Sequence, residues 1–228
     1  ISPKLVSCLN IIIDFFQESI KPRNFIDLYN NLKSSPFGLK DGIIAYLLLY
    51  VFKYKNIIHS VFIKSLNEDG NFEYVNNYDG ELILSLVKNP ENYQIEFSNN
   101  IFENFESAND YLYRLLKLNR IANFVSDDNK DIYNRITVAL SNWYFSIPKY
   151  VREYNYDGNS LEYNVINLIK TSRTNSKKFL LYEIPQMLKM SSGKSKKLNF
   201  DETLKKLEDI LDNYSSQIDV LRSKIIDK

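Results

Sequence analysis

The residue types that most often carry catalysis or bind metal ions are scarce in this chain. Its 228 residues include one histidine, His59, and one cysteine, Cys8. General acid–base catalysis relies most often on histidine, and structural zinc sites need several histidine or cysteine ligands. The sequence therefore predicts neither a zinc site nor a Cys–His dyad, and it predicts that His59 has a structural role.

Two short segments resemble ligand-binding loops, but each lacks a required residue. The Gly-Lys-Ser segment 193–195 matches the end of a phosphate-binding loop, yet the earlier glycine would fall at Leu188. The acidic run 127–131 lacks the central glycine of a calcium loop and places Lys130 at a ligand position. We therefore predict no catalytic residue, no cofactor and no metal, and we expect this chain not to be an enzyme.

Basic side chains are concentrated between residues 146 and 197. This region holds ten lysines and arginines against four acidic residues, a balance of +6 (10 − 4), in a chain of net charge +1. One interpretation is a solvated basic face, and the other is contact with nucleic-acid phosphates. The candidate nucleic-acid-binding residues are Lys170, Arg173, Lys177, Lys178, Lys194, Lys196 and Lys197.

The first secondary-structure elements predicted along the chain are helices. Apolar residues recur every three or four positions in segments 3–16 and 24–33, which is typical of amphipathic helices. A third helix is predicted over 39–55, where apolar residues surround the helix almost completely. Such a helix is expected to lie in a core.

A short β-rich stretch follows the third helix. Segments 57–66 and 72–75 flank the turn sequence Asn-Glu-Asp-Gly and predict a β-hairpin. A helix is predicted over 80–88, capped by Asp79, and an alternating strand over 93–97. This order predicts a winged-helix-like module over residues 1–98.

The remainder of the chain has helical patterns. A helical region is predicted over 99–190, with helices at 101–119, 127–145, 160–170 and 176–189. Pro185 is expected to kink or end the last of these. The whole chain is thus predicted to be mainly α, with a winged-helix-like N-terminal part that carries a small β-hairpin, then a helical bundle and a long C-terminal heptad helix.

The C-terminal segment 198–228 has the most regular apolar spacing in the sequence. The apolar positions are separated alternately by three and four residues over three heptads. Such a helix either packs along its own domain or assembles with another chain, and the sequence leaves both interpretations open. The candidate assembly residues are Leu204, Leu207, Leu211, Tyr214, Ile218, Leu221 and Ile225.

Composition also bears on the cellular compartment of the chain. The longest apolar run, 43–52, is about half the length that a membrane-spanning helix needs, so no membrane partner is expected. The single cysteine and the lack of a secretory signal favour a cytoplasmic protein. The first residue is not methionine, and we expect the chain to be part of a longer protein.

Four segments resemble a known family. Segment 34–44 contains Pro-Phe-Gly-Leu-Lys-Asp-Gly, segment 86–93 contains Lys-Asn-Pro-Glu, and segments 147–152 and 182–185 contain Ile-Pro. Together they resemble the later parts of large bacterial P-loop ATPases of anti-phage systems, including the BREX type. The resemblance implies that the ATPase motifs lie outside this chain and that this part relays or scaffolds interactions.

Two functional hypotheses follow from these observations. The first is a non-catalytic interaction or regulatory region of a larger bacterial anti-phage defence ATPase, with other domains or subunits of a complex as partners. The alternative is a nucleic-acid-binding module that contacts DNA through the basic residues 149–197.

Overall fold

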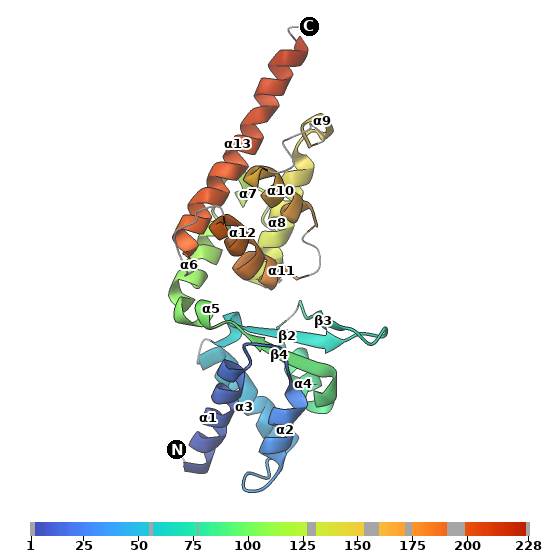
Figure 1. The fold of residues 1–228 in the computed structure, drawn as a ribbon, viewed down its shortest axis with the longest axis vertical. Helices are drawn as coiled ribbons and strands as arrows, with labels where there is room; N and C mark the ends of the chain where they lie inside the picture. Colours follow the sequence, from blue (N-terminus) through green and yellow to red (C-terminus); the bar gives the residue numbers. More distant parts are fainter. Residues whose placement is uncertain are drawn as a thin grey trace. The chain divides into compact units, whose positions relative to one another are not determined.

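The computed structural model describes residues 3–54, 57–76, 78–126, 131–152, 160–171, 175–190 and 199–226. The chain divides into two compact units, Ile1–Phe105 and Glu106–Lys228. Helices dominate both units, and the first unit also contains a small antiparallel sheet (Figure 1). The predicted mainly α-helical class is therefore confirmed, and the predicted C-terminal segment 198–228 falls within the second unit.

The first unit begins with the three predicted helices. Their bounds are α1 (Pro3–Glu18), α2 (Phe25–Lys33) and α3 (Asp41–Tyr54). In α1 the buried residues Cys8, Ile12 and Phe16 recur at intervals of four, so one side of the helix faces the core. Phe16 stacks on Phe52 of α3 with ring centroids 5.3 Å apart.

A short reversal joins α2 to α3. Gly38 has a φ of 60°, a left-handed conformation that glycine adopts without steric cost. Asp41 at the start of α3 accepts hydrogen bonds from Lys33 Nζ at 2.7 Å and from the Tyr29 hydroxyl at 3.0 Å. The bond from Lys33, and after it the bond from Tyr29, lower the pKa of the Asp41 carboxyl. These contacts fix the direction in which α3 leaves α2.

The sheet of the first unit has the strand order β1-β4-β2-β3. Its antiparallel strands are β1 (Arg23–Asn24), β2 (Val61–Leu66), β3 (Phe72–Tyr74) and β4 (Tyr93–Phe97). The predicted hairpin is present as β2 and β3, but β2 begins later than predicted. The first part of the predicted strand is instead a short 3₁₀ turn, η1 (Ile57–His59).

This topology is winged-helix-like. The elements α1, β1, α2, α3, β2 and β4 follow the helix-strand-helix-helix-strand-strand order of that fold, with β4 between β1 and β2. The connection from β2 to β4 carries β3, the helix α4 (Gly80–Lys88) and the turn η2 (Pro90–Asn92). Helices α1 and α2 pack against β4, and α4 packs against α3 (Figure 1).

The region after β4 is more divided than the sequence predicted. The single helix expected over 101–119 is replaced by α5 (Asn99–Glu103), α6 (Phe105–Leu115) and α7 (Asn119–Ala122). Asn104 leaves the helical conformation, and its side-chain amide donates to the Asn100 carbonyl at 2.7 Å. Asparagine favours such local bonds over a continuous helix, which explains the break.

The second unit is organised around α8 (Ile132–Ser146). Asp131 caps this helix by accepting a hydrogen bond from the Asn134 backbone N–H at 2.9 Å. Helix α8 buries residues such as Ile136, Leu140 and Trp143, and it contacts α7, α10 and α11. The further helices of this unit are α9 (Lys149–Arg152), α10 (Leu161–Thr171), α11 (Ser176–Lys178), α12 (Ile184–Met190) and α13 (Phe200–Ile226).

Pro185 is accommodated without ending its helix. The chain runs from α11 through a π-helical turn, Phe179–Glu183, into α12, where Pro185 is the second residue. Proline has no backbone N–H and clashes with the preceding turn of a regular α-helix. The wider π-helical turn immediately before Pro185 is the change that the sequence pattern did not indicate.

Helix α13 packs along its own unit through the first part of its apolar stripe. Leu204, Leu207, Leu211 and Tyr214 are all buried. The ring of Phe200, at the start of the helix, packs against the ring of Tyr111 on α6, with the ring centroids 5.2 Å apart. Burying a leucine side chain stabilises a fold by about 1.5–3 kcal/mol, so this stripe is the main attachment of α13.

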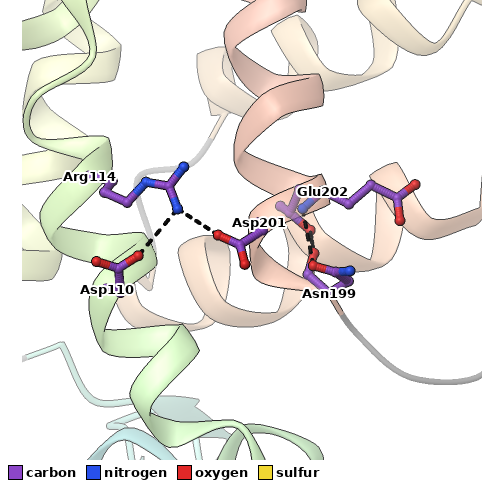
Figure 2. A network of polar contacts seen from close by, with 6 residues as sticks. Asp110, Arg114, Asn199, Asp201 and Glu202 are labelled. Carbon is purple, nitrogen blue, oxygen red and sulfur yellow. Dashed lines mark hydrogen bonds and ion pairs between the residues drawn. The ribbon is translucent and has the colours of Figure 1, made fainter.

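Polar contacts at the start of α13 also orient this helix. Figure 2 shows Arg114 of α6 between two carboxylates, Asp110 at 3.2 Å and Asp201 at 2.5 Å. Asn199 caps α13 by accepting from the Glu202 backbone N–H at 3.1 Å. Because the Arg114 pairs are exposed to solvent, they orient the helix more than they stabilise it.

Leu207→Ala should lower the free energy of unfolding of the second unit by about 2–5 kcal/mol, because Leu207 is fully buried. The matched change Lys205→Ala, at an exposed position of the same helix, should stay within about 0.5 kcal/mol of wild type. Urea unfolding at two protein concentrations measures both. A Leu207→Ala effect that depends on protein concentration would show instead that this stripe is an assembly contact.

Tyr111→Phe should leave the second unit at least as stable as wild type. The Tyr111 hydroxyl is buried and has no hydrogen-bond partner among the described residues. Leaving such a group unsatisfied costs about 1–3 kcal/mol, which the phenylalanine would recover. Thermal unfolding of this variant and of Tyr113→Phe, an exposed position on the same helix, measures the effect. A marked loss of stability in Tyr111→Phe alone would contradict this assignment.

Candidate functional site

Helix α3 exposes a large apolar surface. Its inner side is buried through Ile44, Leu48 and Val51, whereas Tyr46 is 67% exposed. Ile43 and Leu49, one turn to either side of Tyr46, are 49% and 45% exposed. The prediction that this helix lies wholly in a core is therefore wrong for one of its sides.

The reason is the number of elements available to cover α3. Within the first unit, α1, α4 and η1 pack against this helix. A unit of about 100 residues buries a smaller fraction of its surface than a larger domain does, so fewer elements are available to enclose this helix. The side away from these neighbours therefore remains open to solvent.

A groove borders the exposed side of α3. It has a volume of about 650 Å³ and lies between α3, η1 and the start of α4. Its walls are mainly aromatic and aliphatic and also include polar residues. The residues that line it include Tyr46, Leu49, Lys53, His59, Tyr78 and Gly80. We call this surface, together with Ile43, the α3 groove.

Hydrogen bonds hold the α4 side of the α3 groove in place. The Tyr78 hydroxyl accepts from the Ile63 backbone N–H of β2 at 3.0 Å. The Asp79 carboxylate caps α4 by accepting from the Leu82 backbone N–H at 2.9 Å. Both side chains are thereby anchored to secondary structure, so this wall is largely preformed.

His59 contributes to the η1 side of the α3 groove. Its ring lies 5.0 Å from the ring of Phe105, in a tilted arrangement. This packing is consistent with the structural role predicted for His59. Among the described residues, there is no group of three or more histidine, cysteine or carboxylate side chains that could hold a metal ion.

Gly80 leaves open space in the α3 groove. A Cβ atom added at this first residue of α4 would have no heavy atom within 4 Å, apart from its own chain neighbours and helix backbone. The backbone there does not have the positive φ that would strain other residues. A side chain from a bound molecule can therefore approach α4 closely at this point.

The charges of α3 do not resemble those of a DNA-reading helix. In winged-helix and helix-turn-helix proteins that bind DNA, polar and basic side chains of the recognition helix enter the major groove. Within α3 the charged residues are Asp41 and Lys53, and the exposed side presents Ile43, Tyr46 and Leu49. This side is chemically suited to an apolar protein segment rather than to phosphate groups.

The structure separates the predicted nucleic-acid-binding residues. Lys170 is exposed on α10, and Lys178 of α11 is partly buried. Lys177 is only 1% exposed, so its proposed role as a surface phosphate contact is corrected. The candidates Arg173, Lys194, Lys196 and Lys197 lie outside the described residues.

Lys177 occupies an apolar and aromatic environment. Its Nζ lies 6.0 Å from the ring centre of Tyr133. Burial lowers the pKa of the Lys177 ammonium well below its ordinary value, and the nearby Asp131 carboxylate opposes this shift in part. Lys177 and Lys178 are adjacent in the sequence, and nothing in the sequence indicated that Lys177 is fully buried whereas Lys178 is only partly buried.

The assembly role predicted for the stripe of α13 is also corrected in part. Leu204, Leu207, Leu211 and Tyr214 are covered by their own unit and are not available to a second chain. The side chains of Ile218, Leu221 and Ile225 lie outside the described part of the structure. The intramolecular alternative therefore holds for the first four positions.

In the part of the chain that the structure describes, no helix combines the length and apolar character required to cross a bilayer. Comparisons with protein-family models, with curated proteins and with solved structures find no match.

Lys177→Met should change the pH dependence of stability. Because burial lowers the pKa of Lys177, the folded protein binds this proton less tightly than the unfolded chain does. The wild-type free energy of unfolding should therefore rise relative to that of Lys177→Met as the pH increases toward the ordinary lysine pKa, near 10.4. Urea unfolding at a series of pH values measures the difference.

The exposed-lysine variant Lys170→Met is the matched control and should stay within about 0.5 kcal/mol of wild type. A difference between wild type and Lys177→Met that stays constant with pH would show that the Lys177 ammonium titrates as it does in the unfolded chain.

Proposed function

We propose that this chain is a non-catalytic interaction and regulatory region of a larger bacterial anti-phage defence ATPase, and that it docks a partner through the α3 groove. The observation that carries the proposal is the exposed apolar surface of Ile43, Tyr46 and Leu49 beside a preformed groove. Single exposed apolar residues are common on proteins. A contiguous apolar surface next to a groove marks an interaction site.

The partner that fits this surface best is an amphipathic helix from another domain or subunit. The exposed positions 43, 46 and 49 span about 9 Å along α3, at a rise of 1.5 Å per residue. That length matches roughly two turns of a partner helix, with apolar anchors spaced three or four residues apart. Tyrosine is enriched at such contacts because its ring is apolar and rigid and its hydroxyl tolerates water.

The first two segments that carry the family resemblance lie beside the α3 groove. The first motif, 34–44, forms the reversal before α3 and the first residues of that helix. The second motif, 86–93, contains the end of α4, the turn η2 and the first residue of β4. Both motifs therefore flank the pair of helices that forms the α3 groove. We infer that this pair of helices has the same structural role in the ATPases that the chain resembles.

Site-specific photo-crosslinking in the native full-length protein tests the proposal. A photoreactive phenylalanine analogue at Tyr46 should form a crosslink to one defined apolar segment of a partner domain or subunit, identified by mass spectrometry. The same analogue at Tyr113, an exposed tyrosine of the second unit, is the matched control. Crosslinking at Tyr46 that is no stronger or more selective than at Tyr113 would contradict the proposal.

Gly80→Leu should block docking without unfolding the first unit. The added side chain enters open space and meets no strained backbone, so stability should stay within about 1 kcal/mol of wild type. The Tyr46 crosslink should weaken strongly because the leucine side chain occupies the part of the groove next to α4. Gly80→Ala, which adds little bulk, is the control and should retain it. An undiminished crosslink in folded Gly80→Leu would exclude this groove as the docking site.

A further inference from the structure

The second unit contains a small pocket whose chemistry differs from that of the α3 groove. It has a volume of about 100 Å³ and lies between α8, α9, α10 and α13. Two cations, Arg152 and Lys170, line it together with Asn167, three tyrosines and Ile166, and none of the described lining residues is a carboxylate. A positively charged pocket without acidic residues favours an anionic group.

Arg152 is held in a fixed orientation at this pocket. Its Nε donates a hydrogen bond to the Ile147 carbonyl at 2.9 Å. The guanidinium lies 5.5 Å from the ring centre of Tyr144 and 5.4 Å from that of Phe145. Within the described residues Arg152 pairs with no carboxylate. One N–H is thus used for positioning, and the others can bind a ligand in the fork geometry that suits phosphate.

Lys170 supplies the second charge from a different helix. It lies on the same side of α10 as Tyr163 and Asn167, and its side chain is exposed. Among the described residues Lys170 forms no hydrogen bond and no ion pair. The fold therefore brings together two cations separated by 18 positions (170 − 152) in the sequence.

We propose that this pocket binds a phosphate group of a single-stranded nucleic acid. Arg152 and Lys170 would neutralise the phosphate, and the Asn167 amide can donate a further hydrogen bond. The pocket is smaller than the 300–1,000 Å³ typical of sites that enclose a whole small molecule, so the phosphate enters and the base stays outside. Tyr163, 40% exposed, offers that base an aromatic surface for stacking.

The aromatic group beside the cations is the reason for choosing a single strand. Bases in a duplex are already stacked on one another, whereas those of a single strand are free to stack on tyrosine. Lys177, which the sequence placed in the same basic region, is buried and takes no part. The pocket lies within the second unit and does not depend on the α3 groove, so either proposal can fail without the other.

Fluorescence anisotropy with a labelled single-stranded DNA of about twelve nucleotides, within the usual site size, tests this inference across a salt series. The wild-type chain should bind, and Lys170→Gln should weaken binding and reduce the slope of log K against log salt by about 0.7, the value for one lost phosphate contact. Lys205→Gln, an exposed lysine of α13 outside the pocket, is the matched control and should match wild type.

The stacking role is tested with Tyr163. Tyr163→Ala should lower the affinity about 5- to 150-fold with little change in the salt slope, because stacking is not an ionic contact. Tyr163→Phe keeps the ring and should bind like wild type. Circular dichroism of each variant shows whether the second unit is folded, so that a loss of binding reports on the pocket.

Four results would overturn the inference. They are no binding of the oligonucleotide by folded wild-type protein, equal losses in Lys170→Gln and Lys205→Gln, complete competition by inorganic phosphate at the oligonucleotide's own concentration, or preferential binding of a phosphotyrosine peptide. Competition that needs far higher phosphate than oligonucleotide supports it, because the stacked base adds affinity that phosphate alone does not have.

Discussion

The burial of the inner side of α3 is the constraint on which the first unit depends. Ile44, Leu48 and Val51 are completely buried, and the stacked rings of Phe16 and Phe52 join α3 to α1. Helices α1 and α4 and the turn η1 pack against α3, and Ile43, Tyr46 and Leu49 on its other side remain exposed. The same packing that stabilises the unit therefore creates the exposed apolar surface to which we assign docking.

The second unit uses similar residue types in the opposite way. The apolar stripe of α13 looked available for assembly, yet its residues Leu204, Leu207, Leu211 and Tyr214 are buried in the core of their own unit. The basic region is divided as well, because Lys177 is buried whereas Arg152 and Lys170 meet at a small pocket. Whether an apolar or a basic run serves stability or binding is thus decided by what the rest of the fold can cover.

Local signals in the sequence predicted much of the fold. Asp79 as a helix cap and the alternation of 93–97 each depend on neighbouring residues alone, and both predicted features are present. The π-helical turn before Pro185 and the break at Asn104 could not be predicted from helical periodicity. The α3 groove was missed because its exposure depends on distant helices, although an apolar helix in a small unit was a signal that could have indicated it.

The most direct test of the account is the solvent accessibility of α3 in the native protein. This chain's single cysteine, Cys8, is buried, so a maleimide can label the variant Tyr46→Cys in the purified chain against little background. In the longer protein that we propose, labelling is measured by mass spectrometry on the peptide that carries position 46. We predict rapid labelling of Tyr46→Cys in the purified chain and strong protection in the full-length protein inside cells, with Tyr113→Cys labelled in both. Equal labelling of Tyr46→Cys in the two settings would contradict the claim that a partner covers the α3 groove.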